Sequence, residues 1–409
     1  MMTIKGWAGK FSRREFVAAT GAVGLTFVAR SAVGQATAIS APKIKVGLVG
    51  CGGRGQFIAN LMQKHGGYEI VAVADYFQDR VDAFATKFGV AAERCFTGLD
   101  GYKRVLELKP QALIIMTPPY FHPQAAAAAV EAGVHVYVAK PVAVDVPGTL
   151  SIEASGKLAT EKRLCFLVDF QTRAQPFYQE ALRLVHGGAI GEFVFGEASY
   201  HCGRANIQLP IEGAEGRPRN WLFDKALSGD IITEQNIHAL DVMSWVHQQP
   251  PLKVCGTGAR KVRVDVGDAW DTFSLIYRYP GNVAMNFSSR QFDGHGTTPD
   301  GILCRVFGTK GVLETKYGGN VMIRGENFYR GGATKQIYVE GASNNIAAFY
   351  EAIVKGDCSA VNATVTPSVQ STLITIMGRK AAYTDKVVTW QETLADTEQL
   401  DGRLAGLKS

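Results

Sequence analysis

The stretch Gly50-Cys51-Gly52-Gly53-Arg54-Gly55 decides the fold of this chain. It follows an apolar run over residues 43–49, which predicts a buried strand, and it precedes apolar residues at helical spacing over 57–62. Gly50 allows a tight turn, Gly52 lets the backbone approach a pyrophosphate, and Gly55 lets helix and strand pack closely. Strand, glycines and helix in this order predict a dinucleotide-binding turn; a glycine-rich turn of another α/β protein is the alternative.

A second strand, over residues 69–74, ends in Asp75. A carboxylate at this position hydrogen-bonds the ribose hydroxyls of NAD and repels the 2′-phosphate of NADP. We therefore expect NAD as the cofactor. Arg80, five residues further on, is able to offset part of this preference.

The alternation of strands and helices continues through the next 60 or so residues, as a right-handed parallel sheet requires. We expect helices over 79–88 and 124–132 and strands over 112–116 and 134–138. Ligands of such sheets bind beyond the carboxyl ends of the strands. Asp75, the loop 117–122 and Lys140 all follow strand ends, so the sequence places them on one rim. We assign residues 43–164 to an α/β Rossmann NAD(P)-binding domain.

The pattern changes after about residue 165, where strands follow one another without intervening helices. This predicts an α+β domain over residues 165–409 with a large, mostly antiparallel open sheet. We expect strands over 193–200, 254–264, 272–279, 282–289 and 302–307, and helices over 173–186, 234–247, 343–355 and 366–383. Residues 204–220 are predicted to form a long loop over the cleft.

The first 38 residues resemble an export signal. Arg13-Arg14 with Phe16 precedes an apolar run over 17–28 and the small residues Ala36-Thr37-Ala38. The paired arginines predict the twin-arginine route, which carries folded proteins, and an ordinary signal with two chance arginines is the alternative. The run is shorter than the roughly 20 apolar residues of a membrane span, so we expect a cleaved signal, with a permanent anchor as the alternative. We expect residues 1–38 to be removed and the mature protein to be periplasmic or extracellular, with no membrane attachment.

Composition excludes several classes. The chain is 46% hydrophobic and 20% charged, with a net charge of +6, as expected for a globular protein. Five basic residues and one acidic residue of residues 1–38 supply +4, which leaves +2 and no basic cluster for nucleic acid. Seven cysteines without CxxC spacing argue against a zinc site or a complete disulfide framework.

Together these motifs resemble the Gfo/Idh/MocA oxidoreductase family. The matching segments are Gly50 to Gly55, Asp75, Thr117-Pro118 with His122, Lys140-Pro141, and residues 228–241. The resemblance implies a sugar or polyol substrate, a nicotinamide cofactor that exported members hold tightly, and a homo-oligomer formed through the outer face of the second sheet. Ala139 stands where the family usually has Glu, and Glu234 where it usually has Asp. The missing carboxylate at 139 removes any tuning of Lys140 through that neighbour.

Lys140 and His238 carry the expected chemistry. Oxidation of a sugar hydroxyl needs a base for the proton and a donor for the developing alkoxide. Lys140 is expected to stabilise the alkoxide. Glu234, His238 and Asp241 are expected on one helix face at i, i+4 and i+7, with His238 as acid/base and Asp241 fixing its tautomer or contacting substrate. A metal site and a merely polar helix face are the alternatives, and we expect no metal.

Further contacts are assigned by position. Gln171 and Arg173 follow a strand that enters near the cleft, and Arg219 and Trp221 offer groups that hold sugars. Cys51 is expected to be a neutral filler. The expected cofactor contacts are Gly50, Cys51, Gly52, Gly53, Arg54, Gly55, Asp75, Thr117, Pro118, His122, Lys140 and Gln171. The expected substrate contacts are Lys140, Arg173, Arg219, Trp221 and His238, and Tyr200, His201 and Arg204 are further candidates at a strand end.

Three functions fit these residues. The first is an exported NAD(P)-dependent oxidoreductase that takes a hydride from a ring carbon of a sugar or polyol. The second is a glycosidase that oxidises its sugar transiently with the same cofactor, eliminates the aglycone, adds water and reduces the sugar back. The third is a cofactor-binding protein without catalysis, for which the altered residue 139 is the only support.

Overall fold

The computed structural model describes residues 42–213 and 215–409. The predicted export signal, residues 1–38, lies outside the described residues. Within the described part of the chain, no helix is both long and apolar enough to cross a bilayer.

The first sheet confirms the predicted Rossmann architecture. Its strands are all parallel and lie in the order β3-β2-β1-β4-β5-β6. The order reverses between β1 and β4, and this switch point is where doubly wound sheets bind their ligands. The strands are β1 (Ile44–Val49), β2 (Tyr68–Asp75), β3 (Cys95–Thr97), β4 (Ala112–Ile115), β5 (His135–Ala139) and β6 (Phe166–Asp169).

Helices connect these strands and cover both faces of the sheet. They are α1 (Gly53–His65), α2 (Gln78–Phe88), α3 (Gly101–Glu107), α4 (His122–Glu131) and α5 (Val146–Glu161), with short 3-10 turns η1 (Ala92–Arg94) and η2 (Pro119–Phe121). Because β6 pairs with β5, the first domain extends beyond residue 164, the boundary that the sequence predicts.

The second sheet is mostly antiparallel, as predicted, with one parallel pair, β7 and β10. Its order is β14-β13-β12-β11-β7-β10-β9-β8-β15. The strands are β7 (Phe193–Cys202), β8 (Lys253–Ala259), β9 (Thr272–Tyr279), β10 (Val283–Gln291), β11 (Gly301–Gly308), β12 (Gly311–Lys316), β13 (Asn320–Gly325), β14 (Tyr329–Ala333) and β15 (Val388–Thr389).

The strand predicted over 254–264 ends early, at Ala259. The cause is the carboxylate of Asp271, whose Oδ2 accepts the N–H groups of Lys261, Val262 and Arg263 at 2.7–2.9 Å. These donors bend the backbone around one oxygen instead of pairing with a strand.

The remaining helices pack mainly on the inner face of the second sheet and between the two sheets. They are α6 (Pro176–His186), α7 (Gly216–Arg219), α8 (Lys225–Ser228), α9 (Asp230–Glu234), α10 (Ile237–His247), α11 (Ile337–Lys355), α12 (Ser359–Asn362), α13 (Val365–Thr384) and α14 (Trp390–Leu394), with 3-10 turns η3 (Trp221–Phe223) and η4 (Pro280–Asn282). The helix predicted over 234–247 is therefore two helices, α9 and α10.

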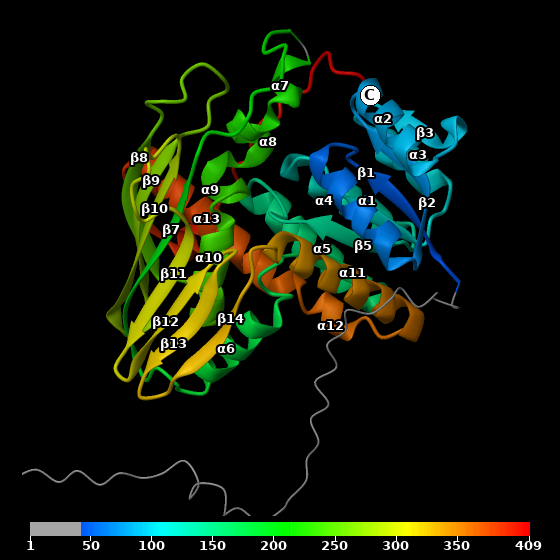
Figure 1. Cartoon of the computed structure of the whole chain (residues 1–409). Coiled ribbons are helices and arrows are strands. Elements are labelled where there is room, and N and C mark those ends of the chain that lie inside the picture. The colour runs from blue at the N-terminus through cyan, green and yellow to red at the C-terminus, as the bar shows by residue number, and fades with distance from the viewer. Residues whose placement is uncertain (1–41, 214) are drawn as a thin grey trace, which may run out of the picture. The chain divides into compact units, whose positions relative to one another are not determined.

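Two late helices complete the first domain. Ile346 and Phe349 of α11 join the core on one face of the first sheet, and Val369 and Leu373 of α13 join the core on the other. Figure 1 shows α11 beside α1. Met377 of α13 instead packs into the core of the second sheet, so α13 joins the two domains.

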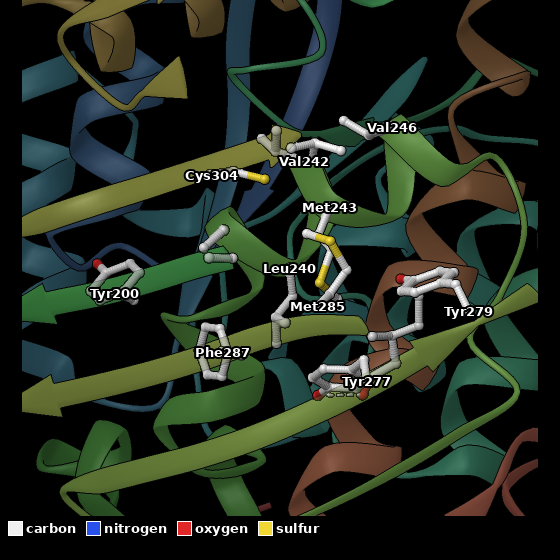
Figure 2. Close-up of a cluster of buried hydrophobic side chains, with 14 of the residues drawn as sticks. Tyr200, Leu240, Val242, Met243, Val246, Tyr277, Tyr279, Met285, Phe287 and Cys304 are labelled. Carbon is white, nitrogen blue, oxygen red and sulfur yellow. Dashed lines mark hydrogen bonds between the residues drawn. The ribbon is translucent and has the colours of Figure 1, made fainter. Parts of the chain in front are cut away.

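The core of the second domain lies between α10 and the second sheet. Figure 2 shows Leu240 and Met243 of α10 against Met285 and Phe287 of β10. The hydroxyl of Tyr277 in β9 donates to the carbonyl of Ile374, 3.1 Å away on α13. This packing sets the position of α10, and with it the position of His238.

One disulfide joins Cys165, just before β6, to Cys358, which follows α11. Cys51, Cys95, Cys202, Cys255 and Cys304 are free. His135 lies beside the pair, but its Nδ1 already accepts the N–H of Cys165 at 2.8 Å. The bridge ties α11 covalently to the first sheet.

Candidate active site

The glycine turn has the geometry that the sequence predicts. Gly50 has a φ of +97°, and a Cβ there would come within 2.5 Å of the backbone of Met116. A Cβ on Gly55 would collide with the carbonyl oxygen of Gly50. Gly52 precedes α1, and no side chain caps that helix. The first N–H groups of α1 therefore stay available to an anion such as a pyrophosphate.

Asp75 supports this turn at the end of β2. Its two carboxylate oxygens accept the N–H groups of Cys51 at 2.7 Å and Phe77 at 3.0 Å. Burial raises the pKa of Asp75, against the opposing effect of these N–H groups and of Arg80. The carboxylate faces the groove described next, where lone pairs remain for ribose hydroxyls.

A groove of about 410 Å³ runs along the switch point. Most of the expected cofactor contacts line it, namely Gly50, Cys51, Gly52, Gly53, Arg54, Asp75, Thr117 and Pro118. Gly55 is buried beneath the turn, and Cys51 is fully buried. Burial raises the pKa of the Cys51 thiol strongly, in keeping with a neutral filler. Turn, helix end and Asp75 together fit a dinucleotide.

His122 does not line this groove, in contrast to the prediction. The ring is buried, with Nδ1 2.8 Å from the carbonyl oxygen of Pro141 and Nε2 2.8 Å from that of Thr117. It links the loop after β4 to the loop after β5. His122 thus holds Thr117 and Lys140 in register instead of contacting the cofactor.

His122 gives the protein an acid-sensitive position. Burial, with the nearby Lys140, lowers its pKa to about 4, against the raising effect of the two carbonyls. The unfolded ring titrates near 6.5, so the unfolded chain binds more protons between pH 6.5 and 4, and stability falls as the pH falls through this window. We expect a loss of about 2 kcal/mol from this ring between pH 7.5 and 5.

Urea unfolding at pH 7.5 and pH 5 checks this expectation. His122→Asn is expected to be less stable at pH 7.5 and to lose less stability than the wild type on acidification. Equal losses in the two proteins would contradict a buried, neutral His122.

A second cavity, of about 240 Å³, adjoins the groove. Arg54, Met116, Thr117 and Trp221 line both. The second cavity is also lined by Pro119, Ala139, Lys140, Asp169, Gln171, Tyr200, Glu234, Gln235, His238 and Tyr338. The structure therefore brings Lys140, Glu234, His238 and Trp221 together in one cavity. Gln171 and Lys140, which the sequence analysis also expects as cofactor contacts, line this cavity and not the groove.

Lys140 is held in this cavity by Glu234. Its ammonium donates to the backbone carbonyl oxygen of Glu234 at 2.5 Å and to the carboxylate at 3.2 Å. Glu234 is the last residue of α9, and the helix is interrupted at residues 235–236 before α10 begins. Glu234 and His238 are thus on separate helices, and Glu234 binds Lys140.

His238 is buried in α10 with its ring in the cavity wall. Its Nδ1 is buried and has no hydrogen-bond partner among residues 42–213 and 215–409, and the ring lies 5.0 Å from that of Tyr317. Burial lowers the pKa of His238 well below its ordinary value, and the positive charges of Lys140 and Arg54 lower it further. A neutral imidazole at pH 7 is in the right state to accept a proton.

Asp241 does not orient His238. Its carboxylate forms a bidentate ion pair with Arg173 at 2.8–3.0 Å and accepts the hydroxyl of Ser371 at 2.7 Å. Arg173 also lies over the ring of Trp245, and neither member of the pair lines the cavity. Glu234 and Asp241 are thus each paired to a cation, Lys140 and Arg173 respectively.

The other substrate candidates divide. Arg219 binds Asp79 on α2 and stacks on Phe77, at the Asp75 end of the groove, so it does not reach the second cavity. Arg204 pairs with Asp265. Trp221 and Tyr200 do line the cavity.

Sequence reasoning missed Asp169 and Tyr338. Asp169 is the last residue of β6, so the rule that ligands bind at strand ends would have identified it. It forms an ion pair with Arg54 and accepts an N–H of Asn345 at 2.8 Å. Tyr338 comes from α11, and no local signal marks it.

Two family models match the chain. One, described as "Oxidoreductase family, NAD-binding Rossmann fold", covers residues 44–170, and one described as "GFO/IDH/MocA C-terminal domain" covers 178–314. Fold, glycine turn and matches define an NAD-binding oxidoreductase. The chain belongs to the Gfo/Idh/MocA family.

Curated relatives include inositol 2-dehydrogenase of Rhizobium meliloti, 23% identical over 321 residues, which are 76% of this chain and 89% of the relative. Glycosyl hydrolase family 109 protein 1 of Akkermansia muciniphila is 27% identical over 190 residues, 45% of this chain and 38% of the relative.

Solved structures share the fold. Scyllo-inositol dehydrogenase of Lactobacillus casei, with NAD(H) and scyllo-inositol bound, has a TM-score of 0.66 at 20% identity, covering 87% of this chain and 100% of that one. Aldose-aldose oxidoreductase of Caulobacter crescentus has a TM-score of 0.67 at 17% identity, covering 85% and 99%.

Proposed function

We propose that this protein is an exported, NAD-dependent oxidoreductase that removes a hydride from a hydroxyl-bearing carbon of a neutral sugar or polyol. The observation that carries the proposal is that Lys140 and His238 line one small cavity that shares Met116 and Thr117 with the cofactor groove.

The residues divide the reaction between them. His238 accepts the hydroxyl proton, and the ammonium of Lys140 stabilises the developing alkoxide. Bound NAD supplies the acceptor for the hydride and its two electrons, so the carbon is left as a carbonyl. Glu234 holds Lys140 in place. Tyr338 and Trp221 line the cavity, and aromatic side chains combine apolar contact area with a polar group for a sugar.

The charges of the cavity favour an uncharged substrate. Arg54 is paired with Asp169 and Lys140 with Glu234, so the two cations are balanced by two carboxylates. A sugar acid would find no unpaired cation among these four residues, and we expect a polyol or aldose to react with a higher kcat/KM than the corresponding sugar acid.

Mass spectrometry tests the cofactor assignment. Protein exported by its own signal and purified without added nucleotide is denatured, and the released dinucleotide is identified. Stoichiometric NAD(H) supports a resident cofactor. Protein free of nucleotide that also fails to bind added NAD would contradict the proposal.

NAD preference is assigned to Asp75. Replacing it with serine removes the repulsion of a 2′-phosphate and one ribose acceptor. We expect the NAD:NADP ratio of kcat/KM to fall at least about tenfold. Asp82→Ser, an exposed carboxylate on α2 outside the groove, is the control. A ratio unchanged in Asp75→Ser would contradict the assignment.

A glycosidase that uses NAD transiently is the second candidate, favoured by the similarity to the family 109 hydrolase. The two are separated with an aryl glycoside as substrate. Release of the aryl alcohol without net NADH formation indicates the glycosidase, and NADH accumulation without cleavage of the glycosidic bond indicates the dehydrogenase.

Export rests on the twin-arginine pattern, and the Cys165–Cys358 disulfide supports it because such bonds persist in oxidising compartments. Fractionation of cells tests it. The outer face of the second sheet, with Ile276 exposed beside a hollow of about 450 Å³, supports a homo-oligomer, to be tested by light scattering.

A further inference from the structure

The last described residues form a strap, defined here as residues 400–409, that crosses from the second domain to the first. Figure 1 shows it in red, passing α7 on its way toward α2. At its start, the carbonyl oxygen of Gly402 accepts from Arg217 at 2.6 Å, and Arg403 pairs with Asp224 at 2.8 Å. At its far end, the carbonyl oxygen of Lys408 accepts the N–H of Leu99 at 3.0 Å.

The far anchor lies at the Asp75 end of the cofactor groove. The N–H of Lys408 donates to the hydroxyl of Tyr76, directly after Asp75, and its ammonium bonds Thr97 at the end of β3. Since Asp75 occupies the position that binds the adenosine ribose, the strap passes over the adenosine end of the groove.

Two leucines of the strap line the groove itself. Leu404 and Leu407 are half-buried, whereas Arg403, Ala405, Gly406 and Lys408 are exposed. The N–H of Leu407 donates to the carbonyl oxygen of Leu404 at 3.1 Å, a tight turn that holds the two residues close together.

We infer that Leu404 and Leu407 are cofactor-binding residues that close the adenosine end of the groove and pack against adenine. The faces of an adenine ring are apolar, and two aliphatic side chains over them gain contact area without needing a polar partner. A roof tied to β3 and α7 slows dissociation of the dinucleotide. The inference rests on the NAD groove and is independent of the sugar substrate.

Leu404→Ser with Leu407→Ser tests the inference while leaving the backbone anchors of the strap in place. The probes are NAD, ADP-ribose and nicotinamide mononucleotide, with Kd measured by calorimetry on protein stripped of nucleotide. We expect Kd to rise on the order of 10- to 30-fold for NAD and ADP-ribose and to change less than twofold for the mononucleotide.

Val387→Ser with Leu394→Ser is the control, because both residues are exposed and lie outside the groove. Unchanged Kd values for NAD and ADP-ribose in the folded double variant would overturn the inference, as would an equal loss for the mononucleotide.

Hydrogen exchange on the wild-type protein gives a second test that needs no variant. ADP-ribose is expected to slow exchange of the amides of residues 404–409, and no change on saturation would overturn the inference. Both tests read binding alone, so a failed sugar assay leaves them interpretable.

Discussion

Lys140→Met is expected to lower kcat about a thousandfold or more while Kd for NAD stays within about threefold. Methionine keeps the length of the side chain but removes the only part of it that is able to stabilise an alkoxide. The charge is lost from the wall of the second cavity, where Glu234 holds the ammonium. Steady-state kinetics and NAD titration on the same preparation separate the two quantities.

Lys157→Met is the matched control, since Lys157 is an exposed lysine of α5 that pairs with Glu153 on the same helix. It is expected to retain wild-type kcat. Lys140→Met activity within threefold of the wild type would place the alkoxide donor elsewhere and would favour a non-catalytic role for this cavity.

His238→Asn is expected to lower kcat/KM by about 10²- to 10⁴-fold, the range for loss of a general base. The pH profile adds a specific signature. The base works only when neutral, and its pKa is lowered well below the ordinary 6.5 by burial and by two cations. The acid limb of the wild-type kcat/KM profile should therefore lie well below pH 6.5, and in His238→Asn this limb should disappear.

His247→Asn controls for the cost of changing a buried histidine on the same helix. His247 stacks on Tyr279 with ring centroids 3.7 Å apart and lies outside the cavity. The control should lose stability but keep kcat and the acid limb. An acid limb that persists unchanged in His238→Asn would assign the base to another group.

The parts of the site that follow from local rules were predictable. Gly50, Gly55 and Asp75 have roles set by backbone geometry and by their place at strand ends, and the structure shows both. Lys140 and His238 were also predictable as site residues, because Lys140 follows a strand end and His238 lies in the segment 228–241 that resembles the family. These predictions need no knowledge of which distant side chains compete for the same groups.

The predicted roles of Asp241 and His122 were wrong because other residues of the folded chain bind these side chains. Asp241 has the right helical spacing to face His238, but Arg173 from before α6 and Ser371 from α13 take its carboxylate. His122 has the right loop position to meet the cofactor, but two backbone carbonyls take its ring. In each case a partner far away in sequence decides the role of the side chain.

Sequence patterns alone predict the Rossmann architecture, the glycine turn, the acid at the end of β2 and the sheet-rich second domain. These depend on periodicity and on turn geometry, which act over a few residues. The folded chain was needed to show that Glu234 holds Lys140, that Arg54 pairs with Asp169, and that Leu404 and Leu407 of the strap line the groove. Such contacts join segments up to about 330 residues apart, as Lys408 and Tyr76 do. These pairings form because a polar group that is buried on folding needs a partner, and a local sequence pattern does not show which distant residue is buried beside it.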